Sequence, residues 1–264
     1  MSATPVPRPP VASPLVTPST PPLVPTSDQA VVLYVLAVYL IIIIPLWHLP
    51  GARHLITPLK LMIVGWHELC HIAMAVMTGG RVLSITIDPN LGGATRVEGG
   101  HPPTILSAGY VGSTLLGFLL LIAGWDTLGS KVASWVIAIG LLCPLVLVRD
   151  KLTIVLTFCY EALLIGFWFI DHANALRFYC LFVGVMSIFY VVWDISEDRF
   201  FNKVNDSDAT QFSLLFPHIP MHLWALFWLL FSCLFFVASV LIGIASFKLS
   251  AADMQTQAAQ WLPT

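Results

Sequence analysis

The sequence predicts an all-α polytopic membrane protein with about seven transmembrane helices and a small β-hairpin between the second and third. The first observation is composition: the 264-residue chain is 58% hydrophobic and 10% charged, with a mean hydropathy of +0.87. A soluble domain carries about 25% charged residues. The second observation is that apolar segments approaching the ~20 residues that cross a bilayer recur along the chain. A net charge of −2 without basic blocks argues against nucleic acid as a partner.

Composition divides the chain into three regions. Residues 1–29 are rich in proline interleaved with serine, threonine and valine, which predicts a disordered cytosolic tail that builds no core. Residues 30–248 form the predicted transmembrane metalloprotease-like domain, and residues 249–264 form a short polar carboxy-terminal tail. The cysteines lie in apolar segments at irregular spacings, so no disulfide framework is indicated.

The membrane domain contains seven candidate spans. Loop lysines and arginines are slightly more numerous on the side that holds the tail, which favours a cytosolic amino terminus. An odd number of spans would place the two termini on opposite sides of the membrane. The predicted spans are Ala30–Leu49, Leu55–Thr78, Thr104–Gly124, Lys131–Val148, Leu152–Ile170, Ala175–Ile195 and Met221–Phe247.

The connection between the second and third spans carries a strand pattern. Polar and apolar residues alternate from Arg81 to Ile87, as in a half-buried strand. Asp88–Gly93 is typical of a turn, and Ala94–Glu98 of a returning strand. The unpaired edge of this hairpin could accept an extended peptide by strand addition. It could equally be an ordinary interfacial hairpin without a substrate role.

Residues 67–71 read His-Glu-Leu-Cys-His in the middle of the second span. Because a helix turns ~100° per residue, His67 and His71 project from one face, a spacing that lets both imidazoles bind one Zn²⁺. The adjacent Glu68 can act as general base toward a water molecule. Such residues could merely hydrogen-bond to neighbouring helices. Three ionisable groups in metal-site spacing inside a membrane instead favour a zinc site.

The third span opens with a run of small residues. Gly109, Gly112, Ser113 and Gly117 create a groove into which another helix can pack closely. Structural packing explains this run without any chemistry. The functional interpretation places this smooth face against the helix that carries the histidines.

These motifs together resemble the site-2 protease-like intramembrane zinc metallopeptidases, and most closely a short, uncharacterised branch of that family. The resemblance covers about Leu55 to Asp208. It implies intramembrane peptide hydrolysis by one zinc ion, with Glu68 activating water. The motifs that carry the resemblance are His67-Glu68-Leu69-Cys70-His71, Gly79-Gly80-Arg81, Gly92-Gly93 and Ser107-Ala108-Gly109-Tyr110-Val111-Gly112-Ser113.

The resemblance also implies a third zinc ligand, an Asp on a later membrane helix in a Leu-Asp-Gly-like motif. Asp194 stands in the position that resembles this residue, although the chain has no Leu-Asp-Gly sequence. Two alternatives remain. Glu161, in the middle of the fifth span, matches the depth of the histidines better. Asp208, in the following loop, resembles another recurring feature of the family.

The functional hypothesis is an intramembrane zinc metalloprotease that hydrolyses peptide bonds of membrane-embedded substrates. Zn²⁺ would be held by His67, His71 and Asp194, with Glu68 as general base. The expected partners are a transmembrane protein substrate or client and the lipid bilayer. The alternative, from a different class, is a non-catalytic relative that binds client helices as a chaperone or adaptor. A zinc transporter fits less well, because transporters usually carry polar residues on several spans and internal repeats.

Overall fold

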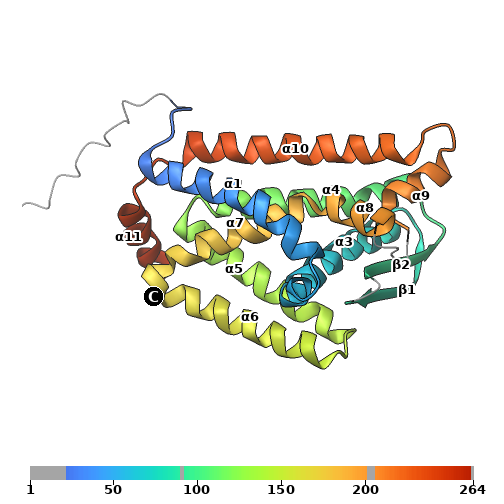
Figure 1. Cartoon of the computed structure of the whole chain (residues 1–264), viewed down its shortest axis with the longest axis horizontal. Coiled ribbons are helices and arrows are strands. Elements are labelled where there is room, and N and C mark those ends of the chain that lie inside the picture. The colour runs from blue at the N-terminus through green and yellow to red at the C-terminus, as the bar shows by residue number, and fades with distance from the viewer. Residues whose placement is uncertain (1–21, 90–91, 201–205, 263–264) are drawn as a thin grey trace, which may run out of the picture.

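The computed structural model describes residues 22–89, 92–200 and 206–262. The chain is 78% helical, with six candidate membrane-spanning helices and one small antiparallel sheet, which confirms the predicted fold class. Figure 1 shows long helices running along the molecule, with the hairpin at one end. The helices are α1 (Ser27–His48), α2 (Ala52–Leu55), α3 (Thr57–Met77), α4 (Pro102–Ala123), α5 (Thr127–Leu142), η1 (Cys143–Val146), α6 (Lys151–Phe169), η2 (Ile170–Ala173), α7 (Asn174–Ile188), α8 (Tyr190–Phe200), α9 (Asp208–Leu215), α10 (Met221–Ser246) and α11 (Ala251–Trp261).

The predicted fifth and sixth spans together form one candidate membrane segment, Lys151–Ile188. Three consecutive non-glycine residues, Asp171, His172 and Ala173, have positive φ angles of 48°, 50° and 70° between α6 and α7. Left-handed backbone at this point ends α6, and Figure 1 shows the chain reversing direction into α7. The segment therefore contains two antiparallel helices, α6 and α7.

The run of small residues on α4 lets two neighbouring helices approach closely. A Cβ atom at Gly109 would meet both imidazoles of the α3 motif, and one at Gly112 would overlap the Cys70 thiol. A Cβ atom at Gly117 would meet the backbone of α7 near Ile188. Small residues therefore place the smooth face of α4 directly against the helix that bears the histidines, as the functional interpretation of the sequence expected.

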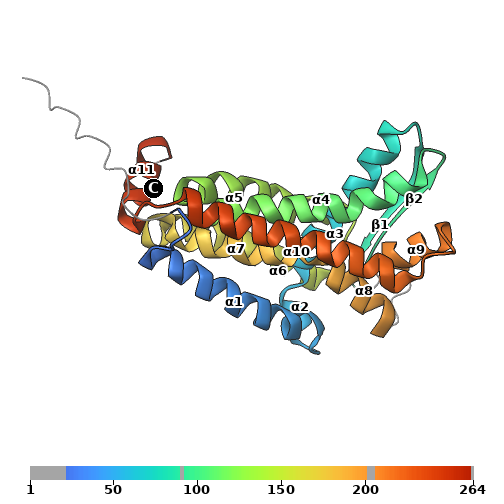
Figure 2. The same ribbon diagram turned by 90° about the horizontal axis from the view of Figure 1, so that it is seen from above.

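The two ends of the membrane domain lie together, so the expectation of termini on opposite sides is wrong. Lys248 Nζ donates to the Val24 carbonyl at 2.7 Å, and the Ala251 amide donates to the Asp28 carboxylate at 3.1 Å. Figures 1 and 2 show why: α3 continues from the end of α1 toward the hairpin instead of folding back beside α1. The prediction of a cytosolic amino terminus assumed that successive loops lie on alternate sides of the membrane, and this assumption does not hold here.

The predicted tails meet the membrane domain at this shared end. A capping box between Thr26 and Gln29 starts α1 inside the proline-rich region, most of which lies outside the described residues. Residues 249–264 contain α11, whose buried Met254 and Ala258 face the bundle. The carbonyl of Leu262 accepts a hydrogen bond from the buried Lys131 ammonium at 2.6 Å. The polar carboxy-terminal segment therefore includes a packed helix.

The two strands β1 (Arg81–Asp88) and β2 (Gly92–Glu98) pair antiparallel, as predicted. A register shift between Val82 and Ser84 breaks the alternation, so Leu83 is exposed while Ile87 is buried. The hairpin lies on α3: a Cβ atom at Gly93 of β2 would overlap the Glu68 carboxylate. The hairpin therefore borders the motif on α3.

Candidate metal centre

Helix α3 presents its two histidines on one buried face. His67 and His71 are one turn apart, and their Nε2 atoms lie 3.0 Å from each other. Nδ1 of His71 donates to the Ile105 carbonyl at 2.7 Å, because a carbonyl oxygen can only accept. Nδ1 of His67 lies 3.3 Å from the Ser113 hydroxyl. These outward contacts from α4 leave both Nε2 atoms pointing into one space, the arrangement of metal-ligating histidines.

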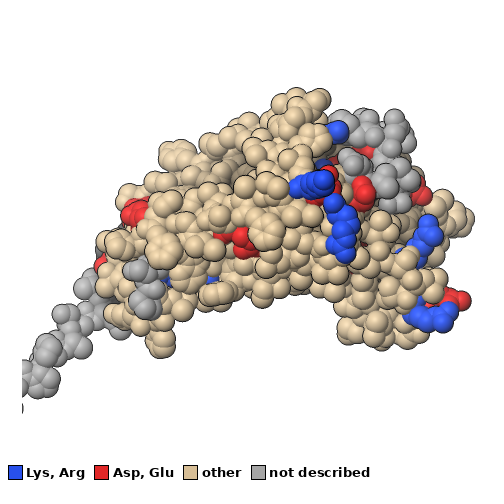
Figure 3. Space-filling model, turned by 90° about the horizontal axis from the view of Figure 1, so that it is seen from below, with Lys and Arg blue, Asp and Glu red and all other residues tan. Residues whose placement is uncertain are grey.

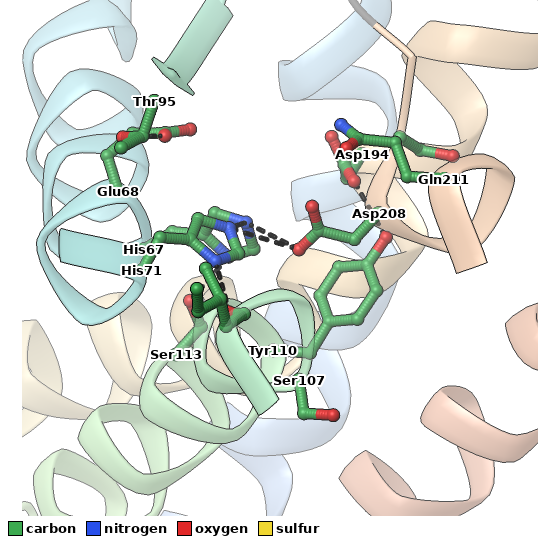
Figure 4. A network of polar contacts seen from close by, with 12 residues as sticks. His67, Glu68, His71, Thr95, Ser107, Tyr110, Ser113, Asp194, Asp208 and Gln211 are labelled. Carbon is green, nitrogen blue, oxygen red and sulfur yellow. Dashed lines mark hydrogen bonds and ion pairs between the residues drawn. The ribbon is translucent and has the colours of Figure 1, made fainter. Parts of the chain in front are cut away.

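Asp208 faces this pair of imidazoles from α9. Its Oδ2 atom lies 3.1 Å from His67 Nε2 and 3.2 Å from His71 Nε2 (Figure 4). That oxygen is buried against the two imidazoles. Ligands at about 2.0–2.1 Å from a tetrahedral zinc ion lie about 3.3–3.4 Å apart. The triangle formed by His67, His71 and Asp208 is close to that spacing, so these three residues fit a zinc ion.

Asp194, the ligand predicted from the sequence, faces the same cavity but lies outside this triangle. Its Oδ2 atom accepts a hydrogen bond from the Tyr110 hydroxyl at 2.7 Å. The same hydroxyl accepts a longer bond of 3.4 Å from the Ala209 amide. Tyr110 therefore connects Asp194 to the first turn of α9. The sequence left Asp208 open as an alternative, and the structure brings that residue to the histidines.

Glu161, the other alternative, is not brought to the histidines. It lies on α6, and the group of potential metal donors found among the described residues contains only His67, His71 and Asp208. The Glu161 Oε1 atom is buried without a hydrogen-bond partner in the described part of the chain.

A second carboxylate fixes the start of α9. Asp198 Oδ2 accepts hydrogen bonds from the Ser207 amide at 3.0 Å, the Ser207 hydroxyl at 2.7 Å and the Thr210 hydroxyl at 2.7 Å. The Ser207 side chain in turn caps α9 by accepting from the Thr210 amide. Asp208 is the first residue of this capped helix, so Asp198 holds the segment that presents Asp208.

The histidines also set the charge of Asp208. Burial alone would raise the pKa of this carboxyl, because a buried charge is poorly solvated. The neighbouring His71 and His67 imidazoles outweigh burial and hold the pKa of Asp208 below its usual range. Asp208 is therefore a carboxylate at neutral pH, the form that binds metal ions.

Glu68 lies beside the imidazoles and is oriented by the hairpin. The Thr95 hydroxyl on β2 donates to Glu68 Oε2 at 2.6 Å. Figure 4 shows the Glu68 carboxylate turned toward Thr95, across the site from Asp208. Since Gly93 on the same strand has no side chain, β2 can approach this carboxylate closely. The hairpin therefore covers and positions the candidate base.

These groups surround a cavity of about 340 Å³ at the hairpin end of the molecule. Its walls come from α3, β2, α4, α8 and α9. Exposed Asp206 and Gln211 lie at its rim, so it opens to the surface there. A polar cavity that reaches the surface gives water access to buried metal donors and a carboxylate.

The sequence interpretation gave no role to three residues of this network. Thr95 falls within the predicted return strand and Tyr110 within the motif that contains the small residues, and Asp198 was not singled out. One local signal was available: Ser207 and Thr210 flank Asp208 in the pattern of a helix N-cap. That pattern predicts a short helix with Asp208 at its start.

The sequence model of the peptidase M50B-like family matches residues 34–239, which is most of the chain. Comparisons with curated proteins and with solved structures gave no match. The matched region runs from α1 to α10 and includes the HExxH sequence, the hairpin and Asp208. The chain therefore belongs to the peptidase M50B-like family, in agreement with its resemblance to the site-2 protease-like peptidases.

Proposed function

We propose that this protein is an intramembrane zinc metalloprotease that hydrolyses peptide bonds of membrane-embedded substrates. The observation that carries the proposal is the convergence of His67, His71 and Asp208 on one buried point beside Glu68. Membership of a peptidase family and a membrane-embedded fold support it. In this proposal Asp208 replaces Asp194 as the third ligand, because its oxygen lies within 3.2 Å of both imidazoles.

The donor set suits catalytic zinc. Two imidazoles and one carboxylate leave a fourth coordination position open, as in other zinc hydrolases. A zinc ion held by His67, His71 and Asp208 would supply Lewis-acid polarisation of the scissile carbonyl and would lower the pKa of a water to about 7. The Ile105 carbonyl and the Ser113 hydroxyl hold the two imidazole rings in the orientation that this role requires.

Glu68 performs the proton transfers. Its carboxylate takes a proton from the attacking water and then gives that proton to the departing amine. The Thr95 hydroxyl, 2.6 Å from Oε2, keeps the carboxylate at the edge of the cavity between these steps. A substrate helix must unwind locally before its backbone can be attacked, since its amides and carbonyls are otherwise paired.

We propose further that the hairpin end faces the cytosol. Figure 3 shows basic side chains gathered toward that end. Under the positive-inside rule this places both described ends of the membrane domain on the opposite side. Labelling of Ser84→Cys by an impermeant thiol reagent in sealed, inside-out vesicles tests the orientation, in a chain whose native cysteines are replaced. Among the described side chains, the basic residues on α2, the start of α3, the hairpin and the η1–α6 connection are Arg53, Lys60, Arg81, Arg96, Arg149 and Lys151, and those on α5, α7 and the segment after α10 are Lys131, Arg177 and Lys248.

The proposal is tested by zinc content and cleavage measured together. Detergent-purified wild type is compared with His67→Ala and Glu68→Gln, and each is assayed on a reporter with a cleavable transmembrane helix. We expect about one zinc per chain in wild type, none in His67→Ala, and full zinc content without cleavage in Glu68→Gln.

The alternative of a client-binding chaperone or adaptor makes a different prediction. Bound zinc together with a cellular phenotype that Glu68→Gln leaves unchanged would favour the adaptor. Absence of zinc from carefully prepared wild type would contradict the metalloprotease.

A further inference from the structure

A second cavity lies beside the metal centre, and its lining is apolar whereas that of the metal centre is largely polar and charged. Its volume is about 490 Å³, within the range of about 300–1,000 Å³ that is usual for small-molecule sites. None of the described residues that line it is charged. They come from one face each of α3, β1, α4, α5 and η1, and include Met62, Trp66, Ile87, Leu120, Ile137 and Val146.

The apolar cavity is separate from the catalytic one. No lining residue is shared between the two, because α3 and the hairpin packed on it stand between them. β2 contributes Gly93 and Thr95 to the metal cavity, whereas β1 contributes Ile85 and Ile87 to the apolar cavity. An occupant of the apolar cavity therefore does not reach the metal donors, so the space does not serve as a cleavage subsite.

The size and position of the cavity favour an extended hydrocarbon chain. Several residues at its rim are exposed on the membrane-facing surface, among them Leu69, Ile139 and Val146. One turn of an α-helix, about 10 Å across and 5.4 Å long, would fill nearly the whole volume. The cavity therefore has room for about one turn of a partner's transmembrane helix, whereas a lipid acyl chain, with its much smaller cross-section, can extend along it.

A cation stands at one end of this cavity. Arg149 is exposed, and its NH1 group donates to the Leu145 carbonyl at 2.8 Å and to the Val148 carbonyl at 3.3 Å. These two carbonyls belong to the same short segment as the lining residues Pro144, Val146 and Leu147. The guanidinium is thus held against the backbone of the segment that forms the η1 end of the cavity, two residues after the lining residue Leu147.

We propose that this cavity binds one acyl chain of an anionic phospholipid, whose phosphate pairs with Arg149. The apolar walls recognise the chain, and the guanidinium beside the η1 end supplies the charge complementarity for the headgroup. The proposal rests on the membrane fold and is independent of peptidase activity. The bound lipid would occupy the side of the α3–hairpin contact that faces away from the site.

Photo-crosslinking in reconstituted vesicles tests the proposal. The full chain is placed in phosphatidylcholine vesicles that contain a trace of phosphatidylglycerol with a diazirine in one acyl chain, and labelled residues are located by mass spectrometry. We expect labelling of segment 136–147 to exceed, several-fold, labelling of the exposed α10 residues Leu226, Leu230 and Leu234. The α10 face reports ordinary contact with bulk lipid in the same sample.

Two variants separate chain binding from headgroup binding. Arg149→Gln should lower cavity labelling by the anionic probe about fivefold, and leave labelling by a phosphatidylcholine probe unchanged. Arg81→Gln is the matched control, since it removes an exposed cation that is paired with Glu98 across the hairpin. Gly65→Leu fills the cavity, because its Cβ would already touch Ile87 and Pro144 at 3.4 and 3.5 Å, and should reduce labelling by both probes.

Val136→Phe provides a second way to fill the cavity from its rim if Gly65→Leu fails to fold. Equal labelling of the cavity and the α10 face would overturn the proposal, because it would show only bulk lipid. Strong labelling that is equal for both probes and insensitive to Arg149→Gln would overturn the assignment of the headgroup.

Discussion

The two sides of the metal centre are built in different ways. On one side, α3 supplies both imidazoles and the candidate base within five consecutive residues, so helix periodicity alone sets their spacing. On the other side, two carboxylates from separate helices line the same cavity, and hydrogen bonds decide which of them faces the histidines. Asp194 accepts a hydrogen bond from the Tyr110 hydroxyl, whereas Asp208 lies against the imidazoles. Donors local in the sequence can thus be predicted from a motif, whereas a donor brought by a distant segment depends on the contacts that place it.

Substitution of the two carboxylates in parallel is the strongest test of this contrast. Asp208→Asn should weaken zinc binding by more than about 100-fold, beyond the about 10–100-fold that loss of an outer partner produces. Asp194→Asn keeps an acceptor for Tyr110 and should retain zinc within about tenfold of wild type. Competition with a zinc-chelating dye measures both. The reverse order would make Asp194 the ligand and would overturn the assignment drawn from the geometry.

The next test removes the hydrogen bonds that hold the start of α9. Asp198→Ala deletes the acceptor of three hydrogen bonds at the start of α9, so Asp208 should lose its fixed position. We expect zinc affinity to fall about 10–100-fold while the protein remains folded in size-exclusion chromatography. Glu98→Ala is the control, because it removes the same charge from an exposed ion pair at the same end. Equal zinc affinity in both variants would show that Asp198 does not position Asp208.

The α3 side can be perturbed through the hairpin. Thr95→Val removes the hydroxyl that donates to Glu68 and should lower the cleavage rate at least about tenfold, because a hydrogen bond to a charged group contributes about 1.5–3 kcal/mol. Zinc content should not change, since Thr95 touches no metal donor in the described structure. Thr95→Ser should restore the rate. A loss of zinc in Thr95→Val would instead indicate a general disturbance of the site.

The smallest expected effect concerns the link between the two carboxylates. Tyr110→Phe removes the hydroxyl that bonds Asp194 and the Ala209 amide. The bond with the Ala209 amide is the one that reaches α9, and neutral hydrogen bonds of this kind contribute about 0.5–1.5 kcal/mol, so zinc affinity should fall about two- to tenfold. Isothermal titration with zinc at fixed pH measures this change. If Tyr110→Phe weakened zinc binding as much as Asp208→Asn, Tyr110 would contribute more to positioning the metal donors than its two hydrogen bonds indicate.

Local patterns were sufficient for the framework of this protein. Composition predicted the membrane fold, alternation predicted the hairpin between α3 and α4, and the His67–His71 spacing predicted two donors on one helix face. Small residues on α4 correctly predicted a close contact with α3, because a glycine in a helix leaves room that only a neighbouring backbone or side chain can fill. Each of these features depends on residues that are close in the sequence.

Tertiary structure alone decided the rest. The sequence placed the termini on opposite sides, because it could not show that α3 continues past α1 rather than folding back. It favoured Asp194 over Asp208 as the third ligand, whereas the position of Asp208 next to the histidines depends on the Asp198 contacts with Ser207 and on the hydroxyl of Tyr110. The physical reason is the same in both cases: helix direction and carboxylate partners are fixed by packing between distant segments, which periodicity along one segment does not encode.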